Sequence, residues 1–475
     1  MKGDSTPIQV PPKGRASWRA TLSSFLLIVV GFTLTSTAYI AWLYRLMEFV
    51  PSGVADGLTL IGGYSLQALG IGIVALIGRR WPGVFSRSLF VLVVALHFAC
   101  AVPAIMGQSF VGVLVFGYMM NVFCGAIAAY YLYSLMGRVP MRRRGIVFGG
   151  GYACSILISW LSRGVPVGAG DALGSLILCV VLSVVAVCVA FLPIGQGVSI
   201  SKQGEPPARS GFQPPTAVLR QNVRVIVVFA GFAVLLMSLV KNVGFSFPTA
   251  DITAGVNLEL SRLFYAAGLV IAGIVSDRSR RSGAVCCVAA LITPFICMAL
   301  ANEPLPGTAM WAIDYFFFGF FSVFRVVLFS DIADNSERAY LSGFGLMIGR
   351  IGDALGTAVC ITLDDNALAL VVVAGVLFAA AIFVVHRLFQ LIFTPEPAPM
   401  KSGAQLFEEF SISYDLSTRE REVMRLLLTE LSNTEIASEL YVTESTVKFH
   451  VHNILRKTDC KNRQELRATY ARFVE

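Results

Sequence analysis

Between residues 21 and 392 this chain carries a succession of apolar stretches, each of about 20 residues. A helix of that length spans the ~30 Å hydrocarbon core of a bilayer, where only helices and closed barrels satisfy their own backbone hydrogen bonds. Composition agrees, because 56% of the residues are hydrophobic and only 14% are charged, against roughly a quarter charged in soluble domains. We therefore expect an all-α, polytopic membrane domain of about 12 spans. These spans begin near Thr21, Asp56, Ser88, Phe110, Gly145, Ala172, Val223, Arg262, Gly283, Thr308, Leu341 and Ala367.

A polar interruption divides the spans into two sets of six. Residues 195–220 include the sequence EPPARSGFQPP and are expected to form a cytoplasmic central loop. The third span of the second set is short and contains Pro294, where we expect an interruption. Residues 1–20 form a basic tail before an apolar run that is too long for a signal peptide, which predicts a retained first span.

Basic residues gather in alternate loops, and Lys and Arg mark the loops that stay in the cytoplasm. An even number of spans returns the C-terminus to the basic side. Both termini are therefore predicted to be cytoplasmic, in a multi-pass protein of the inner (cytoplasmic) membrane. The basic side holds Arg79, Arg80, Arg87, Arg138, Arg142, Arg143, Arg144, Arg278, Arg280 and Arg281, and the other side holds little more than Arg45, Arg163 and Lys241.

The loop after the second span of the second set reads GIVSDRSRR, from Gly273 to Arg281. This loop and the six-plus-six plan resemble the major facilitator superfamily of transporters, whose loop signature combines Gly, a small residue, Asp, Arg and a basic pair. The matching loop of the first set, GRRWPG from Gly78, lacks the Asp. The resemblance implies that Asp277 braces neighbouring helices and takes no part in substrate chemistry. A plain cytoplasmic loop with inside-positive charge explains the same residues equally well.

A few polar side chains interrupt the apolar spans, where such residues are costly and are candidates for function. Arg350 and Asp353 share one helix face, so they form either a ligand-sensing pair or a self-neutralising structural pair. His97 and Asn121 are further candidates for ligand sensing, although a lone histidine more often hydrogen-bonds a neighbouring helix. Arg325 is expected to snorkel to a cytoplasmic interface. The full set is Gln67, His97, Asn121, Arg325, Arg350 and Asp353.

The chain changes character after Phe393. Residues 393–410 include TPEPAPMKSGAQ and are predicted to form a polar, Pro-rich linker. Residues 411–475 contain Ser417 with Glu420, Ser432 with Glu435 and Asn462 with Glu465, three pairs that fit the capping box of a helix start, and Thr443 caps a further helix. Four short helices are therefore expected. Their predicted core comprises Leu416, Val423, Leu426, Leu427, Ile436, Leu440, Val447, Val451, Ile454, Leu455 and Leu466.

Four segments, TREREV, SNTEIASEL, STVKFHVHNIL and KNRQEL, follow one another between Leu416 and Leu466. In this order and at this spacing they resemble the helix-turn-helix DNA-binding domain of LuxR-type regulators, which implies that residues 411–475 bind DNA. Two positions depart from the family. Glu430 replaces the usual Gly before the second helix and is expected to alter the turn, and Thr458 replaces the usual Leu and is expected to loosen packing beneath the fourth helix.

The third predicted helix presents one polar face, because Val447 packs inward and leaves the opposite side exposed. Lys448 can donate to guanine O6 and N7, Phe449 can pack on a thymine methyl, and His452 adds a donor one turn later. The resemblance implies that these three approach bases, and that Thr446 and Arg456 approach phosphates. Basic side chains outnumber acidic ones after Glu444, as a nucleic-acid interface requires. The predicted DNA-contacting set is Ser445, Thr446, Lys448, Phe449, His452 and Arg456.

Two functions remain open from these features. The first is a membrane-bound transcriptional regulator whose membrane domain senses a signal, and the alternative is a secondary transporter with a DNA-binding regulatory appendage. Expected partners are double-stranded DNA, the lipid bilayer, RNA polymerase and an unknown small-molecule ligand, with homodimerisation on DNA. The sequence shows no nucleotide loop, catalytic constellation or metal-ligand spacing, so we expect no enzyme, no cofactor and no metal site.

Overall fold

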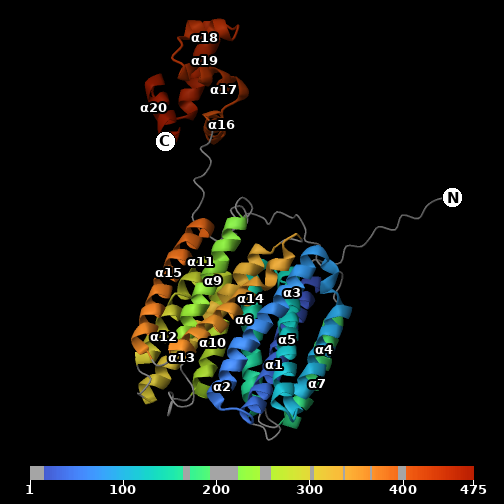
Figure 1. Ribbon diagram of the computed structural model, residues 1–475. Helices are drawn as coiled ribbons and strands as arrows, with labels where there is room; N and C mark the ends of the chain where they lie inside the picture. Colours follow the sequence, from blue (N-terminus) through green and yellow to red (C-terminus); the bar gives the residue numbers. More distant parts are fainter. Residues whose placement is uncertain are drawn as a thin grey trace, which may run out of the picture. The chain divides into compact units, whose positions relative to one another are not determined.

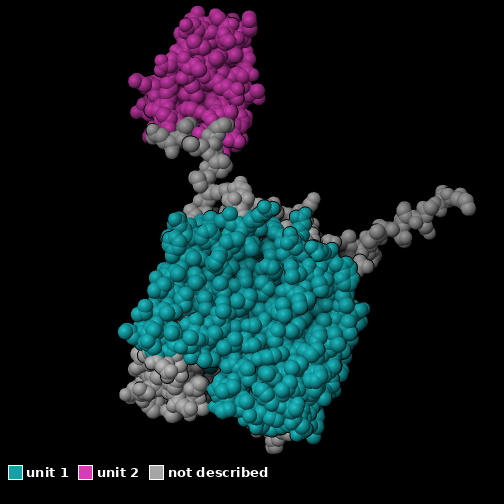
Figure 2. Space-filling view, viewed as in Figure 1, with its two compact units in different colours: residues 1–394 teal, residues 395–475 magenta. Residues whose placement is uncertain are grey.

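A computed structural model describes residues 15–163, 172–192, 223–245, 258–299, 304–334, 337–363, 366–393 and 403–474. The chain divides into two compact units, Met1–Thr394 and Pro395–Glu475, which Figure 2 shows in teal and magenta. Every regular element in the described ranges is a helix, so the all-α prediction is confirmed. The central loop predicted at residues 195–220 lies outside the described residues.

The first half of the membrane unit is a set of long helices that run side by side (Figure 1). Large apolar side chains stay exposed on their outer faces, for example Leu76 and Val111, each 67% exposed, as lipid-facing helices require. In chain order the elements are α1 (Arg15–Met47), α2 (Ser52–Gly57), the π-helical η1 (Leu58–Gly63), α3 (Tyr64–Arg80), the short η2 (Pro82–Phe85), α4 (Arg87–Met106), α5 (Phe110–Arg138), the short η3 (Met141–Arg143), α6 (Arg144–Arg163) and α7 (Ala172–Phe191).

The second half repeats this plan. Its last helix is the most apolar, and Leu368 on it is 76% exposed. The elements are α9 (Val223–Phe245), α10 (Leu258–Arg278), α11 (Arg280–Cys286), α12 (Ala289–Ala299), α13 (Pro304–Ile332), the short η4 (Ala339–Gly343), α14 (Phe344–Leu363) and α15 (Ala367–Phe393).

Ten helical runs in the described residues are long and apolar enough to cross a membrane. α10 and the α11–α12 pair occupy the two remaining positions of the predicted order, so the arrangement agrees with six spans plus six. The third span of the second half is interrupted, as predicted, but the break lies at Cys287 and Val288. Pro294 lies within α12. The expected break at Pro294 was therefore wrong, since membrane helices tolerate proline where neighbouring groups satisfy the freed carbonyl.

The two halves meet where α6 crosses α10 and where α3 crosses α14. α6 and α10 approach so closely that a Cβ on Gly149 would lie 2.2 Å from the backbone oxygen of Leu269. A Cβ on Gly273 would lie 2.6 Å from the backbone oxygen of Gly145. Small residues at a crossing let backbones pack directly, which drives helix association in lipid. These glycines therefore create one seam between the halves.

The second unit forms its own small helical core, and its four predicted helices are all present. Two predicted capping boxes, at Ser417 and Ser432, have both of their hydrogen bonds. The third is half formed, because Asn462 accepts from the amide of Glu465, whereas the Glu465 carboxylate accepts from the amide of Lys461. The helices of the unit are α16 (Gly403–Ser413), α17 (Thr418–Leu428), α18 (Asn433–Glu439), α19 (Glu444–Lys457) and α20 (Arg463–Val474).

α16 is a helix that the sequence did not predict, and it begins inside the stretch 393–410 that we assigned to the linker. Its Phe410 ring lies 5.2 Å from the rings of both Tyr470 and Phe473 of α20, edge-on in each case. Phe407 is buried beside it. The observed core comprises Phe407, Phe410, Leu416, Val423, Met424, Leu427, Ile436, Ala437, Val447, Val451, Ile454, Cys460 and Leu466, with the predicted Leu426, Leu440 and Leu455 only partly buried.

Candidate nucleic-acid interface and membrane cavity

The turn between α18 and α19 sets the direction in which α19 leaves the core. Tyr441 takes a left-handed φ of 52°, and the amide of Val442 donates to the oxygen of Ala437 at 3.0 Å, which ends α18. Thr443 then caps α19 by accepting from the amide of Thr446. Ala437 is small and buried, so the two helices can cross closely. These local interactions build a helix-turn-helix.

α19 has one buried face and one exposed face. Val447, Val451 and Ile454 are buried in the core of the unit. Phe449 points away from that core and keeps 61% of its surface exposed. The six predicted DNA-contacting residues all lie off the buried stripe: Ser445, Lys448, Phe449, His452 and Arg456 are exposed, and Thr446 is half-buried. The structure therefore brings the whole predicted set onto one accessible helix face.

Lys448 has a local partner on this face. Its Nζ lies 2.8 Å from Glu444 Oε1, one turn earlier, and both side chains are exposed. Exposed pairs of this kind contribute only about 0–1 kcal/mol, so a phosphate or a guanine can replace Glu444 at little cost. Arg456 and Lys457 lie in the last turn of α19, where positive charge interacts favourably with the helix dipole.

A buried acid ties α17 to α19. Glu420 of α17 accepts a hydrogen bond from Lys457 Nζ of α19 at 2.8 Å, and the same Nζ donates to the backbone oxygen of Asp415 at 2.7 Å. Burial works to raise the pKa of Glu420, but the hydrogen bonds from Lys457 and Ser417 outweigh it, so the pKa is lowered. The ionised carboxylate is therefore part of what fixes α19.

The two departures from the family pattern are accommodated within the fold. Glu430 adopts a φ of 69°, the left-handed conformation that a glycine would take, so the turn keeps its course. Its Oε1 accepts a hydrogen bond from Arg467 of α20 at 3.1 Å. Thr458 is buried, and its hydroxyl donates to the backbone oxygen of Ile454 at 2.8 Å. Each of the two residues thus acquires a hydrogen bond, Glu430 with α20 and Thr458 within its own helix turn.

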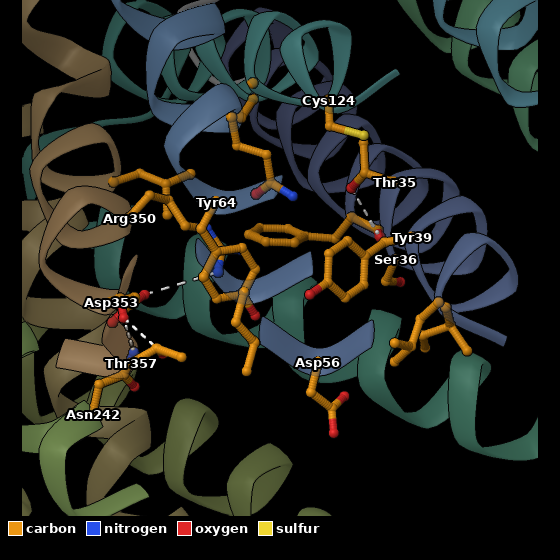
Figure 3. A pocket seen from close by; sticks show the side chains of 18 of the residues that line it. Thr35, Ser36, Tyr39, Asp56, Tyr64, Cys124, Asn242, Arg350, Asp353 and Thr357 are labelled. Atoms are coloured by element: carbon orange, nitrogen blue, oxygen red, sulfur yellow. Dashed lines mark hydrogen bonds and ion pairs between the residues drawn. The ribbon is translucent and has the colours of Figure 1, made fainter. Parts of the chain in front are cut away.

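A cavity of about 500 Å³ lies between the two halves of the membrane unit. Helices α1, α2, α3, α5 and α6 line it from the first half, and α9, α13 and α14 line it from the second. Figure 3 shows Thr35, Ser36 and Tyr39 of α1 on one side and Arg350 and Asp353 of α14 on the other. Much of the lining is aromatic: Phe32, Tyr39, Tyr64, Tyr131, Tyr152, Tyr315 and Phe318.

Asp353 is the centre of a buried charge cluster in this cavity. Its carboxylate lies 3.6 Å from Lys241 Nζ, 3.6 Å from Arg325 Nη1 and 3.9 Å from Arg350 Nη1. Its backbone oxygen accepts from Asn242 at 2.5 Å and from the Thr357 hydroxyl at 3.0 Å, as Figure 3 shows. The predicted pair of Arg350 and Asp353 is present, but as one edge of a four-residue cluster.

Two of these cations lie in the cavity, where the sequence did not predict them. Arg325 was expected to snorkel to the interface, yet it is only 4% exposed and lines the cavity. It fits there because Gly349 of α14 has no side chain: a Cβ at that position would lie 2.4 Å from Arg325 Nη1. Lys241 was assigned to an outer loop, but it lies inside α9 and is 5% exposed. Hydropathy gave no signal for this burial, because Lys241 and Asn242 end the apolar run that begins at Val223.

The other predicted sensing residues lie outside the cavity lining. Asn121 is buried behind Gln67, whose amide donates to Asn121 Oδ1 at 2.7 Å, and Gln67 itself lines the cavity. His97 is fully buried in α4, and neither ring nitrogen hydrogen-bonds another described residue. The structure therefore brings Arg350 and Asp353 together with Arg325 and places His97 elsewhere.

A second charge cluster joins the halves at the α11 end of the unit, opposite the end that carries α2 (Figure 1). Asp277 accepts from the backbone amides of Gly145 and Ile146, both at 2.8 Å. Arg280 Nη1 lies 2.9 Å from Asp277, and Arg280 Nε lies 2.7 Å from Asp331. Asp277 thus braces helices of both halves, as the resemblance of its loop implied.

The fold and the exposed helix face define a membrane protein that carries a DNA-binding helix-turn-helix. Residues 415–469 match the family described as bacterial regulatory proteins, luxR family. The spore germination protein GerE of Bacillus subtilis is 41% identical over 58 residues, which are 12% of this chain and 78% of GerE. The nitrate/nitrite response regulator protein homolog of Haemophilus influenzae is 46% identical over 48 residues, which are 10% of this chain and 23% of that protein. The chain belongs to the luxR family through this domain, and the predicted resemblance is confirmed.

Solved structures are similar to the membrane unit. The human organic anion transporter MFSD10 (TETRAN) is 15% identical with a TM-score of 0.56, over 79% of this chain and 100% of that one. The major facilitator superfamily proton:xylose symporter XylE is 12% identical with a TM-score of 0.55, over 80% of this chain and 97% of that one. At these identities the likeness shows the fold, and the membrane unit has the fold of that superfamily.

Proposed function

We propose that this protein is a membrane-bound transcriptional regulator that binds DNA sequence-specifically through α19 and is controlled by a signal sensed in the membrane unit. One observation carries the proposal: a luxR-family domain shares its chain with a membrane unit whose cavity encloses the charges around Asp353. Charges within a membrane are costly and mark functional sites by default. Occupation of the cavity would change the conformation of the membrane unit, and thereby the pairing or availability of the DNA-binding domains.

On DNA, α19 would lie in the major groove. Lys448, Phe449 and His452 would contact base edges, with Ser445 beside them, and Thr446 and Arg456 would contact phosphates. We further propose that the domains pair as a homodimer on two half-sites and act on RNA polymerase. The exposure of this face, opposite the buried Val447 and Val451, supports the assignment.

The proposed setting is the inner (cytoplasmic) membrane with both termini in the cytoplasm. We divide the chain into a tail at residues 1–20, a membrane domain at 21–392, a linker at 393–410 and the DNA-binding domain at 411–475. The Arg-rich sequences around Arg144 and Arg280 support this orientation, since such loops stay inside. α16 argues for extending the folded part of the DNA-binding domain back to Gly403.

Crosslinking of the intact protein to the chromosome, followed by immunoprecipitation and sequencing, tests the proposal. We expect discrete sites that share one motif, and we expect Lys448→Ala to lose them at unchanged membrane abundance. Arg472→Ala, on α20, is the matched control and should retain them. Wild-type protein that enriches no specific site would contradict the proposal.

A secondary transporter with a DNA-binding appendage is the second candidate, and the cavity within a transporter fold favours it. Purified protein in lipid vesicles distinguishes the two, because a transporter dissipates a substrate gradient and a sensor does not. Regulators and transporters of these families are generally not enzymes, and we propose no catalytic activity.

A further inference from the structure

We infer that the membrane cavity binds an organic anion, with a carboxylate or phosphate head group on the cation cluster and an apolar body against the aromatic wall. The cluster comprises Lys241, Arg325 and Arg350 around Asp353. This inference rests on the proposed sensing function, for which it names the chemical class of the ligand.

The cations of the cluster lie at long ion-pair distances from the Asp353 carboxylate. Three cations surround one carboxylate, at 3.6, 3.6 and 3.9 Å. Each distance exceeds the limit of about 3.2 Å for a good N–H···O hydrogen bond. Asp353 therefore attracts the cations by charge without a short hydrogen bond to any of them.

Arg325 is the cation whose donors are least used. It is 4% exposed, and neither its Nε nor its Nη1 hydrogen-bonds another described residue. A buried guanidinium with unsatisfied donors is unfavourable. Two oxygens of a carboxylate or phosphate match the planar fork of donors that a guanidinium presents. An anionic head group is thus the ligand that completes this site.

Two other carboxylates near the cavity belong to the described residues, and neither fills that role. Asp56 lines it from α2, and Figure 3 shows it away from Asp353, below the α1 side chains. Asp314 of α13 is buried behind the lining, within electrostatic reach of Lys241, and accepts a hydrogen bond from Thr293 at 2.5 Å. Neither makes an ion pair with Arg325 among the described contacts.

The remainder of the lining suits an apolar or aromatic body. Arg350 lies over the ring of Tyr64 at 4.1 Å, and Lys241 lies over the ring of Phe318 at 3.7 Å, so the rings orient the cations before a ligand arrives. A volume of about 500 Å³ is typical of small-molecule sites. The cavity therefore has a charged wall and an aromatic wall.

The lining also indicates the side of entry. It includes Gly53 and Asp56 of α2, at the end of the unit opposite α11. At the α11 end the halves are joined, because Asp277 accepts from the amides of Gly145 and Ile146 and Asp331 pairs with Arg144. An anion would therefore arrive from the side opposite the Arg-rich loops, which the positive-inside rule places outside the cytoplasm.

The test measures binding to the purified full-length protein in lipid nanodiscs, by thermal unfolding in the presence of benzoate, phenyl phosphate or neutral benzamide. A ligand that binds the folded state raises the midpoint as its concentration rises. We expect at least one of the two anions to do so and benzamide to have little effect. Arg325→Gln should weaken the effective anion about tenfold or more, and Arg80→Gln, an exposed arginine at the end of α3, should leave it unchanged.

Asp353→Asn is a second variant that keeps the test decisive even if Arg325→Gln fails to fold. Removal of the competing carboxylate should make anions bind more tightly, on the order of tenfold, and a gain in affinity cannot result from misfolding. The inference is overturned if neither anion exceeds benzamide, or if a folded Asp353→Asn protein binds anions more weakly. The assay contains no DNA. Anion binding without a transcriptional response would therefore contradict the sensing function alone, and regulated DNA binding without anion binding would contradict the ligand class alone.

Discussion

Lys448 lies on the exposed face of α19 and pairs with Glu444 in the absence of DNA. Because that pair contributes only about 0–1 kcal/mol, DNA can displace it. We expect Lys448→Ala to cost about 1–3 kcal/mol at the preferred site and to relax the preference for one base, whereas Arg456→Ala should weaken all sequences alike. Binding selections on randomised DNA measure both effects. An unchanged preferred site and affinity in Lys448→Ala would show that another residue reads the groove.

Glu430 is a second position where one side chain affects the stability of the DNA-binding unit. Its φ of 69° costs a residue other than glycine roughly 1–2 kcal/mol, and its exposed bond to Arg467 returns only part of that. We expect Glu430→Gly to stabilise the DNA-binding unit by up to about 1 kcal/mol. This net gain is what remains of the relieved strain once the extra conformational entropy that glycine gives the unfolded chain is taken into account. Glu430→Ala keeps the strain and loses the bond, so it should destabilise slightly. Urea denaturation of both variants decides the sign.

At the scale of helices, Glu420 and Lys457 connect α17 to α19. The pKa of Glu420 is lowered in the folded state, against the opposing effect of burial. A lowered pKa stabilises the folded state at pH values above the unfolded pKa, which is about 4.3. This stabilisation is lost as the pH falls through the pKa of the folded state. We therefore expect the unfolding free energy of the unit to fall below pH ~5, and Glu420→Gln to flatten that fall while costing about 1–2 kcal/mol at neutral pH. An equally steep fall in the variant would assign the effect to other acids.

α16 provides a second test at this scale. Phe410 is fully buried against Tyr470 and Phe473 of α20. We expect a fragment from Lys401 onward to be helical, soluble and able to bind DNA with strong salt dependence. Phe410→Ala should cost that fragment about 3–5 kcal/mol, whereas exposed Ile412→Ala should cost little. Circular dichroism during denaturation measures both, and equal stability of the two variants would mean that α16 is dispensable.

Elements whose signals are local were predictable from the sequence. The helix starts at Ser417 and Ser432 depend on residues within one turn, and both capping boxes formed as expected. α16 was missed because its aromatic residues acquire a partner only in α20, about sixty positions away in the sequence. Local propensity carries little information about such a contact, since most helical stability in proteins comes from tertiary packing.

The membrane site was predicted only in part, for a related reason. Arg350 and Asp353 are three positions apart on one helix, so their pairing followed from helix geometry. Arg325 and Lys241 joined them through contacts between helices, and hydropathy near a span end could not distinguish a buried cation from one that snorkels. The cluster therefore required the arrangement of α9, α13 and α14.

In the whole molecule, the proposed function requires the cavity in the membrane unit to control transcription. Asp353 interacts with Lys241 and Arg325 as well as with Arg350, and Arg350 lies over the ring of Tyr64. We expect Arg350→Asp and Asp353→Arg each to abolish the response of a reporter placed behind the protein's own operator. The combined exchange should not restore it, because it would bring a third cation against Lys241 and Arg325 and set a carboxylate against Tyr64.

A pair that serves only to neutralise itself would behave differently, since reversing both charges keeps the attraction within α14. Restoration of the reporter response by the exchange, at wild-type abundance in the membrane, would therefore assign Arg350 and Asp353 to scaffolding and leave the DNA-binding assignment intact. Arg80→Gln is the matched control, because it removes an exposed arginine outside the cavity and should respond normally. Membrane abundance is measured for every variant, since a buried charge without its partner destabilises a protein by several kcal/mol. A folded exchange variant that stays silent would place the cluster in the pathway from the cavity to the promoter.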